Sequence, residues 1–393
     1  MTARRIAMVI GTRPEAIKMA PVYLGLAKDP RTEVLLVATA QHRAMLDQVL
    51  SVFGIKPDVD LDLMQQDQTL AELSSRVISG VHAALAQLRP DAVLVHGDTS
   101  TCLFSALAAF YQRVPVGHVE AGLRTYNFDA PWPEEMNRRL TDPICQWCFA
   151  PTARARENLL AEAVPDENIF VTGNTIVDAL LIARDMARRR PLAVPGLSAQ
   201  ALDGKRLVLI TGHRRESFGQ PFQEFCFALR DVVRRHEDVV LVYPVHLNPN
   251  VQQPVHRILG QQDRVFLVPP VDYLSFVGLM DRSYLIITDS GGIQEEAPSL
   301  AKPVLVTRET TERPEAVEAG LARLVGTSRE RIVEEVGRLL TDDGLYARMC
   351  RGHNPYGDGR AAERIIDALC QGPGPQNAGE RPSAANARGD ESR

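Results

Sequence analysis

Short β-branched runs alternate along the chain with longer stretches in which apolar residues recur at helical spacing. Apolar runs without polar alternation are typical of parallel strands that are buried on both faces. A first set of predicted strands comprises Ile6–Ile10, Val34–Thr39, Ala92–His96, Pro115–Val119 and Cys148–Ala150. Ala- and Leu-rich segments between them predict helices at Thr69–Gln87 and Thr101–Tyr111. This βαβ order predicts a doubly wound domain.

The same pattern begins again after Gly173. A second set of predicted strands comprises Leu207–Thr211, Val239–Tyr243, Val265–Leu267, Leu285–Thr288 and Pro303–Val306. Predicted helices at Phe222–Arg235 and Glu330–Leu340 lie between and after these strands. The fold class is therefore expected to be α/β, with two doubly wound Rossmann-like domains that face a central cleft.

The predicted N-terminal domain spans residues 1–172, and the predicted C-terminal domain spans residues 173–360. A terminal helix over residues 361–371 is expected to pack back on the N-terminal domain. Residues 372–393 are rich in Gly, Pro, Asn, Ser and Arg and have almost no large apolar side chain. Such a segment cannot offset the entropy cost of ordering, so the sequence predicts a disordered tail.

Composition narrows the class of protein. The 393-residue chain is 45% hydrophobic and carries a formal net charge of −5, so we expect a soluble globular protein that does not bind nucleic acid. No apolar run reaches transmembrane length and the N-terminus leads directly into a strand, so we expect no membrane partner and a cytoplasmic location. Cys145 and Cys148 form a lone C-x-x-C without the second pair that a structural zinc site needs. We interpret them as core residues and predict no metal.

A Ser-Gly-Gly helix start follows the predicted strand Leu285–Thr288. Backbone N–H groups at Ser290, Gly291 and Gly292 can bind an anion, because glycine lets a phosphate approach without a Cβ in the way. Glu296 lies about one helical turn further along, where a carboxylate can accept hydrogen bonds from a ribose diol. A phosphate site and a diol site at this spacing indicate a bound nucleotide. An ordinary Gly-rich turn with a solvated glutamate is the alternative at this point.

Two cations follow the first predicted strand. Arg13 lies at the strand end and Lys18 lies within two turns of it, so both can face the cleft. The segment has neither G-x-G-x-x-G nor Walker spacing, so NAD and ATP sites are disfavoured and no cofactor is predicted. Solvated cations at a helix start are the alternative interpretation.

Three carboxylates gather at the ends of neighbouring elements. Asp98 and Glu120 follow adjacent predicted strands, and Glu134 lies on a proline-broken loop that enters a helix. Because carboxylates are rarely buried without partners, this set indicates acid/base chemistry. A salt-bridged network with arginines such as Arg138 is the alternative.

The second domain supplies a set of cations. His213 and His246 follow its first two strands, and Arg313 follows a later one. Imidazole and guanidinium groups that face a Ser-Gly-Gly helix start would hold a diphosphate. Acid/base groups thus belong to one domain and phosphate-binding groups to the other, so the reacting bond is expected in the cleft between them.

Eight motifs carry a resemblance to a known family. They are GTRPEAIKMAP (Gly11–Pro21), HGDT (His96–Thr99), GHVEAGLRT (Gly117–Thr125), PWPEEMNR (Pro131–Arg138), GHRRES (Gly212–Ser217), YPVHLNPN (Tyr243–Asn250), TDSGGIQEEAP (Thr288–Pro298) and TTERPEAVEAG (Thr310–Gly320). From about residue 5 to residue 370 the chain resembles the non-hydrolysing UDP-N-acetylglucosamine 2-epimerases. The resemblance implies a fold of the glycosyltransferase-B type, a homodimer, and an isomerase that interconverts UDP-GlcNAc and UDP-ManNAc for cell-surface polysaccharide synthesis.

The resemblance also implies roles for individual residues. Asp98, Glu120 and Glu134 resemble the acid/base carboxylates, and the sequence leaves open which of them serves which face of the sugar. His213 joins them as a catalytic residue that also orients the diphosphate. The residues expected to bind substrate are Arg13, Lys18, Arg138, Val271, Phe276, Ser290, Gly291, Gly292, Glu296 and Arg313.

Within the substrate-binding set, the Ser-Gly-Gly backbone would bind phosphate and Glu296 the ribose. Phe276 and the backbone near Val271 would bind the uracil. Some family members bind a second UDP-GlcNAc beside the active site as an activator, and the resemblance places that second site at Gln41, His42 and His246. Ala44 stands where a longer polar side chain can occur in members with this site, so the sequence leaves activation open.

The expected chemistry is an elimination followed by an addition. The C-2 proton of the sugar is not next to a carbonyl, so a carboxylate cannot simply remove it and return it. Loss of UDP together with the C-2 proton gives 2-acetamidoglucal, and re-addition with protonation from the opposite face gives the epimer. This route needs a base, an acid and stabilisation of the departing diphosphate, but neither metal nor nicotinamide. The alternatives are a retaining UDP-sugar glycosyltransferase, a 2-epimerase of a modified sugar such as a diacetamido uronate, and a nucleotide-sugar sensor.

Overall fold

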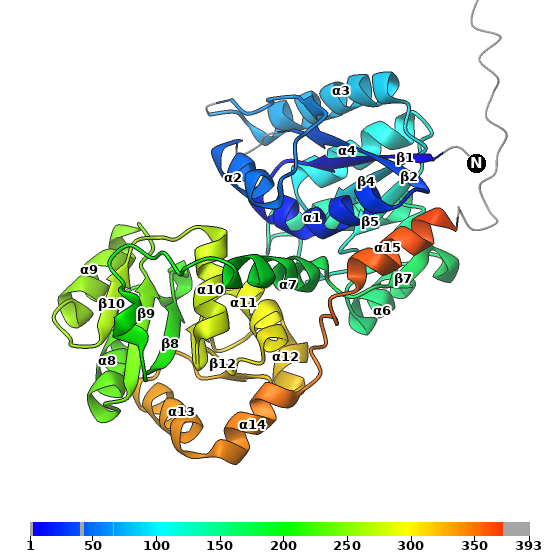
Figure 1. The fold of residues 1–393 in the computed structure, drawn as a ribbon. Helices are drawn as coiled ribbons and strands as arrows, with labels where there is room; N and C mark the ends of the chain where they lie inside the picture. The colour runs from blue at the N-terminus through cyan, green and yellow to red at the C-terminus, as the bar shows by residue number, and fades with distance from the viewer. Residues whose placement is uncertain (1–2, 40–42, 66, 372–393) are drawn as a thin grey trace, which may run out of the picture.

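The chain folds into two parallel β-sheets, each packed between helices (Figure 1). The computed structural model describes residues 3–39, 43–65 and 67–371. In that part of the chain the first sheet has seven strands in the order β3-β2-β1-β4-β5-β6-β7. The strands are β1 (Arg4–Ile10), β2 (Thr32–Ala38), β3 (Val59–Asp60), β4 (Ala92–His96), β5 (Val116–Val119), β6 (Trp147–Ala150) and β7 (Ile169–Val171). The helices around them are α1 (Arg13–Lys28), α2 (Arg43–Phe53), α3 (Leu70–Leu88), α4 (Ser100–Tyr111), α5 (Glu134–Thr141) and α6 (Ala153–Ala161).

The second sheet has six strands in the described residues, in the order β10-β9-β8-β11-β12-β13. The strands are β8 (Arg206–Thr211), β9 (Val239–Pro244), β10 (Val265–Val268), β11 (Leu285–Thr288), β12 (Val304–Val306) and β13 (Ala322–Leu324). The helices around them are α8 (Gln220–Arg235), α9 (Pro249–Leu259), α10 (Tyr273–Arg282), α11 (Gly291–Glu296), α12 (Pro314–Glu318), α13 (Arg329–Thr341) and α14 (Asp343–Arg351). Short 3-10 helices lie at Asp142–Ile144, Asp166–Asn168, Ala199–Leu202, Arg215–Ser217 and Ala297–Leu300.

The strand order reverses at one point in each sheet. β1 lies between β2 and β4, and β8 lies between β9 and β11. In open parallel sheets, ligands bind beyond the carboxyl ends of the strands at such a switch point. The carboxyl ends of β8 and β11 are in register, with Thr211 opposite Thr288 and their hydroxyl oxygens 2.5 Å apart. The loops after β1, β4, β8 and β11 are therefore the first places to look for a site.

Two helices connect the halves of the molecule. α7 (Thr175–Arg188) packs against α1 of the first half and α10 of the second, and it lies between the halves in Figure 1. α15 (Ala361–Cys370) packs on α1, where a Cβ on Gly25 would meet the Ile366 side chain at 2.4 Å. The chain crosses between the halves twice, and the backbone N–H of Asn174 donates to the carbonyl of Tyr356 at 2.6 Å where the crossings meet.

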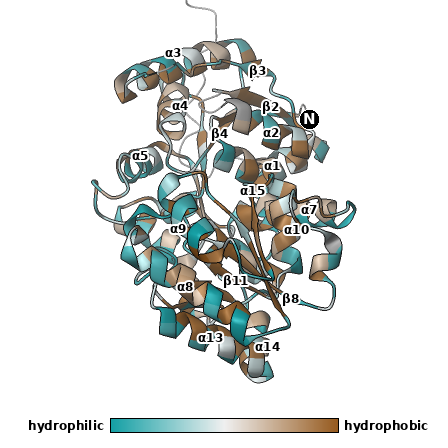
Figure 2. Cartoon of the chain, turned by 90° about the vertical axis from the view of Figure 1, so that its left-hand side faces the viewer, coloured by the Kyte–Doolittle hydropathy of each residue, from teal (hydrophilic) through white to brown (hydrophobic). Residues whose placement is uncertain are grey.

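Apolar side chains fill the space between each sheet and its helices. The strands around β8 and β11 are brown in Figure 2, whereas the surface around α9 is largely teal. Cys145 and Cys148 are free and buried, and burial holds the pKa of both thiols well above the ordinary range, as core packing requires. Among the described residues, no helix combines the length and the apolarity needed to cross a bilayer.

The two doubly wound parallel sheets confirm the predicted α/β fold class. Their strand orders follow from the right-handed βαβ crossovers that each alternating segment makes. The first sheet ends at Val171, and α7 begins at Thr175. The predicted domain boundary at residue 173 falls in the short link between them.

Candidate active site

Side chains from both halves meet beyond the ends of β1, β5 and β11. Nζ of Lys18, on α1, lies 2.5 Å from Oε2 of Glu120, the residue after β5. Burial disfavours the charged ammonium, but the carboxylates of Glu120 and Glu295 outweigh it and raise the pKa of Lys18. Burial likewise favours the neutral acid at Glu120, but Lys18, with His96, holds the pKa of Glu120 well below its ordinary range. The two groups therefore form a charged pair.

The backbone at Glu120 is in the left-handed region, with φ of +68°. This conformation costs a residue with a Cβ roughly 1–2 kcal/mol, so it persists only where other contacts hold it. Oε2 of Glu120 also accepts a hydrogen bond from Nδ2 of Asn174 at 2.9 Å. His96 lies alongside, with Nε2 at 3.7 Å from Oε2 of Glu120, and neither ring nitrogen of this buried histidine has a hydrogen-bond partner among the described residues.

A second ion pair joins β4 to α5. Nη2 of Arg138 lies 2.9 Å from Oδ2 of Asp98, and the side-chain amide of Asn137 donates to the Asp98 carbonyl at 2.8 Å. Glu135, fully buried beside them, accepts from the backbone N–H groups of Thr125 and Tyr126. The structure thus pairs two residues that the sequence predicts for different tasks, an acid/base carboxylate and a substrate-orienting arginine.

Glu134 is the first residue of α5 and is half-buried. The described part of the chain supplies no hydrogen bond or ion pair to its carboxylate. A helix start is a favourable place for a carboxylate, because the helix dipole is positive there. Glu134 is therefore placed by its helix rather than by side-chain partners.

The buried His118 links the loop after β4 to the residues after α5. Nδ1 of His118 lies 2.6 Å from Oδ1 of Asp142, and Nε2 lies 2.6 Å from the carbonyl oxygen of Gly97. Because both partners are acceptors, both ring nitrogens must carry hydrogen, and the ring is an imidazolium. Burial opposes this charge, but the neighbouring Cys102 and Asp142 raise the pKa of His118 well above 6.5. Arg124 balances Asp142 from the other side at 2.6 Å.

The second half presents the start of α11. Ser290 is its N-cap, and its backbone N–H donates to Oγ1 of Thr288 at 2.9 Å. A Cβ added to Gly291 would meet nothing within 4 Å, and one added to Gly292 would meet only Oγ of Ser290 at 3.9 Å. The backbone there is open to a group as bulky as a phosphate.

His213 is fixed by the aspartate that precedes Ser290. Oδ2 of Asp289 accepts from the backbone N–H groups of His213 at 2.6 Å and Arg214 at 2.8 Å. The His213 ring stacks on His246, with centroids 5.2 Å apart and planes at 13°. The exposed ring of His213 therefore lies next to the start of α11, whereas Gln41 and His42 fall outside the described residues.

Three charged residues of the second half face the first half. Arg313 forms an ion pair through Nε with Oε1 of Glu295, whose Oε2 lies 3.3 Å from Nδ2 of Asn174. Burial and the neighbouring Glu295 raise the pKa of Glu296 to about 8, while Lys18 and Arg13 act in the opposite direction. Arg13 and Lys18 thus lie close to the carboxyl group that the sequence assigns to a ribose.

Val271 and Phe276 lie at the start of α10 and are half-buried. Tyr273 between them is buried and contacts Phe53 of the first half, with ring centroids 6.3 Å apart. This apolar contact is a second link between the halves, beside the ionic one. Burial raises the pKa of the Tyr273 hydroxyl well above its ordinary range, and the nearby Glu296 carboxyl group acts in the same direction.

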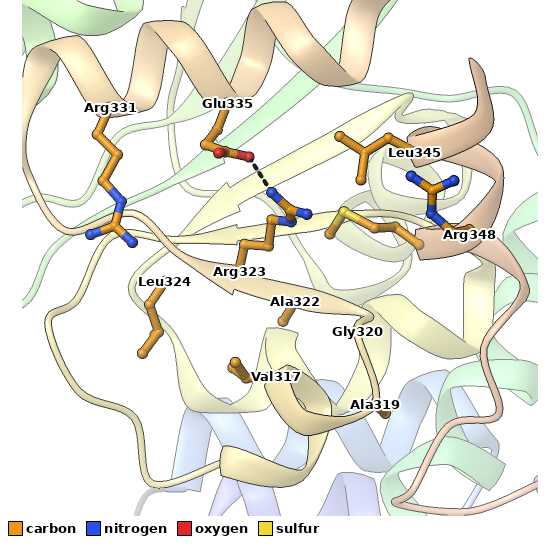
Figure 3. Close-up of a pocket in the computed structure, with 11 residues that line it drawn as sticks. Val317, Ala319, Gly320, Ala322, Arg323, Leu324, Arg331, Glu335, Leu345 and Arg348 are labelled. Carbon is orange, nitrogen blue, oxygen red and sulfur yellow. Dashed lines mark hydrogen bonds and ion pairs between the residues drawn. The ribbon is translucent and has the colours of Figure 1, made fainter. Parts of the chain in front are cut away.

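A separate pocket of about 590 Å³ lies on the outside of the second half (Figure 3). It is lined by residues of α12, β13, α13 and α14, and among them Arg323 pairs with Glu335 at 2.8 Å. None of the predicted site residues lines it. The candidate active site is therefore distinct from this pocket.

Several residues of the site are missed by the sequence prediction. Glu15 is buried and accepts hydrogen bonds from Gly11, Thr12 and Thr99, so it ties the ends of β1 and β4 together. The spacing of Thr12 and Glu15 is that of a capping box, and this signal was available in the sequence. His96 and Glu295 lie within the HGDT and TDSGGIQEEAP motifs but have no predicted role there, and no comparable signal marks Asn174.

Known proteins resemble this chain in sequence and in fold. The sequence profile described as UDP-N-acetylglucosamine 2-epimerase matches residues 25–370. The UDP-N-acetylglucosamine 2-epimerase of Escherichia coli (strain K12) is 58% identical over 368 residues, which cover 93% of this chain and 98% of the relative. The enzyme of the same name from Campylobacter jejuni is 48% identical over 375 residues, which cover 94% of this chain and 98% of the relative.

A solved structure has the same fold. The crystal structure of UDP-GlcNAc 2-epimerase from Neisseria meningitidis bound to UDP-GlcNAc superposes with a TM-score of 0.83 at 47% identity, over 93% of this chain and 100% of that one. The profile match and the full-length relatives lead to one assignment. The chain belongs to the UDP-N-acetylglucosamine 2-epimerase family.

Proposed function

We propose that this chain interconverts UDP-GlcNAc and UDP-ManNAc by inverting C-2 of the sugar. The observation that carries the proposal is the buried pair of Lys18 and Glu120, in which an ionised carboxylate of the first half is linked through Asn174 to Glu295, on the helix that begins with the predicted phosphate-binding residues. Membership of the epimerase family and the UDP-GlcNAc-bound relative from Neisseria meningitidis support the choice of substrate.

In this proposal the second half binds UDP. The backbone N–H groups of Gly291 and Gly292 hold the diphosphate, where the open space beside Gly291 lets phosphate oxygens approach, and the N–H of Ser290 joins them by exchanging Oγ1 of Thr288 for a phosphate oxygen. Glu296 binds the ribose hydroxyls, and Phe276 with the backbone near Val271 binds the uracil.

Cations from both halves complete the diphosphate site. Arg13 and Lys18 approach from the first half and Arg313 from the second, and the ring of His213 lies beside the helix start. Charge-assisted hydrogen bonds of this kind stabilise a diphosphate more as its negative charge grows, which favours its departure from C-1.

The first half then supplies proton transfer. A carboxylate removes the C-2 proton, the electron pair of that C–H bond forms the C-1–C-2 double bond, and the C-1–O bond breaks with its electrons leaving on UDP. The intermediate is 2-acetamidoglucal. Protonation of C-2 from the opposite face and return of a UDP oxygen to C-1 give the epimer. Asp98, Glu120 and Glu134 are the groups available for these two steps, and Arg138 orients the sugar.

The test is incubation of the protein with UDP-GlcNAc alone in D₂O, followed by NMR. The expected product is UDP-ManNAc that carries deuterium at C-2, because the removed proton exchanges with solvent through the carboxylates. A requirement for a sugar acceptor would point to a glycosyltransferase instead, and a product without deuterium would overturn the elimination. Sedimentation analysis tests the accompanying proposal that the enzyme is a homodimer.

A further inference from the structure

Asn174 stands where the chain first crosses between the halves and is buried. Its side chain makes three hydrogen bonds. Oδ1 accepts from the backbone N–H of Ile176 at 3.0 Å and so caps α7. Nδ2 donates to Oε2 of Glu120 at 2.9 Å and to Oε2 of Glu295 at 3.3 Å. One amide group therefore bridges two carboxylates that belong to different halves of the molecule.

Each of the two carboxylates has an ion-pair partner in its own half. Glu120 forms an ion pair with Lys18 in the first half, and Glu295 forms an ion pair with Arg313 in the second. An amide is well suited to the place between them, because it has two N–H donors and no charge. Two buried carboxylates without such a donor would repel each other and lose hydrogen bonds.

The hydrogen bonds from Lys18 and Asn174 to Glu120 engage only one of its two carboxylate oxygens. Lys18 and Asn174 both bind Oε2, whereas no described residue gives Oε1 a hydrogen bond. A carboxylate held by one oxygen in this way presents the other for proton transfer.

We infer that Asn174 is a positioning residue of the epimerase reaction, which holds Glu120 for proton transfer at C-2 and ties its place to Glu295 and Arg313 of the UDP-binding half. The inference rests on the proposed function. Asn174 acts through Glu120 and contributes no proton of its own. The amide thus connects the half that binds UDP with the half that carries the base.

The alternative is that Asn174 matters only as the cap of α7. Two substitutions separate these roles, because Asp and Ser both cap helices about as well as Asn. Asn174→Asp keeps the capping oxygen but replaces the two-donor amide with a third carboxyl group. Asn174→Ser keeps a cap, adds no charge and is too short to bridge both carboxylates.

Both variants are expected to remain folded at the assay temperature and to keep the UDP affinity of the wild type in calorimetry, although loss of the bridging amide should lower the melting temperature of both, most in Asn174→Asp. Their kcat for UDP-GlcNAc should fall roughly 10²-fold, the usual effect of a small displacement of a reacting group. The acid limb of the pH profile should move to higher pH in both variants, which lose the N–H donor to Glu120, and further in Asn174→Asp, which adds a neighbouring carboxyl group. The charged and titratable groups that face Glu120, namely Lys18, His96, Glu295 and Arg313, are the same in both variants, so this shift belongs to position 174.

Wild-type kcat in both well-folded variants would overturn the inference and leave the proposed function standing, since Asn174 would then be a helix cap alone. A loss of kcat that only follows a loss of folded protein in thermal melts would overturn it as well. Failure of the wild type itself to form UDP-ManNAc would remove the proposed function, and the inference with it.

Discussion

Lys18 of α1 forms an ion pair with Glu120, the residue after β5, with Nζ 2.5 Å from Oε2. One residue is predicted to orient the diphosphate and the other to move a proton, so the ion pair connects binding to catalysis. If Lys18 turns toward a bound diphosphate, its positive charge moves away from Glu120. The pKa of Glu120 then rises, and the carboxylate becomes a stronger base.

Removal of the Lys18 charge tests this connection. In Lys18→Met the pKa of Glu120 should rise, because the main group that lowers it is gone. Activity that needs an ionised Glu120 should then be lost at a higher pH, so the acid limb of the kcat/KM profile moves upward. Lys28→Met, at the exposed end of the same helix, is the control. An acid limb at the same pH in Lys18→Met and in the control would rule out the coupling.

The three predicted acid/base residues are tested by isosteric amides. Asp98→Asn, Glu120→Gln and Glu134→Gln should each lower turnover by roughly 10²–10⁴-fold, the usual worth of a positioned acid or base. UDP binding should change little, because none of the three carboxylates is proposed to bind the nucleotide, and the groups proposed to bind its uracil and ribose lie in the other half. Glu363→Gln, an exposed member of an ion pair with Arg360, should leave turnover unchanged. Full activity in all three variants would remove acid/base catalysis by these carboxylates.

The sequence predicts the fold well wherever a strand is long enough to show a pattern. All ten predicted strands are present, with ends that differ by at most two residues from those in the structure. The prediction misses β3, β7 and β13, which have two or three residues each. Such short strands exist because a neighbour offers a free sheet edge, as β2 does for β3. That reason lies in tertiary structure rather than in local pattern.

The sequence predicts only part of the site, because the pairing of its residues also depends on tertiary structure. The rule that ligands bind beyond strand ends brings Arg13, Lys18, Asp98 and Glu120 together from sequence alone. It does not say which of them pair. Asn174 and Glu295 are 121 residues apart, and a hydrogen bond over that separation leaves no trace in a single sequence.

The buried imidazolium of His118 makes a prediction about stability. Asp142→Asn removes its counter-charge, and breaking a buried pair in this way should lower the free energy of unfolding by about 3–5 kcal/mol. Asp166→Asn breaks an exposed pair with Arg156 and should cost at most about 1 kcal/mol. Denaturant unfolding of the two variants gives the comparison. Equal losses in both would mean that the His118 pair contributes no more than a surface pair.

The same pair predicts how the loss depends on pH. The pKa of His118 in the folded protein is raised above its unfolded value near 6.5, so its contribution is complete below that pH. It declines as pH rises from there through the folded pKa. The difference between wild type and Asp142→Asn should therefore be larger at pH 6 than at pH 9. A difference that grows with pH would contradict a charged His118.

Glu296 gives the last prediction, which concerns protons taken up or released with UDP. Burial and Glu295 raise its pKa to about 8, so near pH 7 most molecules carry a neutral acid at this position. If the ribose hydroxyls donate to an ionised Glu296, UDP binding must release a proton below pH 8, and affinity should rise with pH between about 6 and 8. Calorimetry in two buffers of different ionisation enthalpy measures that proton directly. Glu296→Gln, which cannot ionise, should bind UDP without proton release, and Glu296→Ala should weaken binding by about 1.5–3 kcal/mol. Proton release that is the same in wild type and in Glu296→Gln would assign the titrating group elsewhere, for instance to the diphosphate itself.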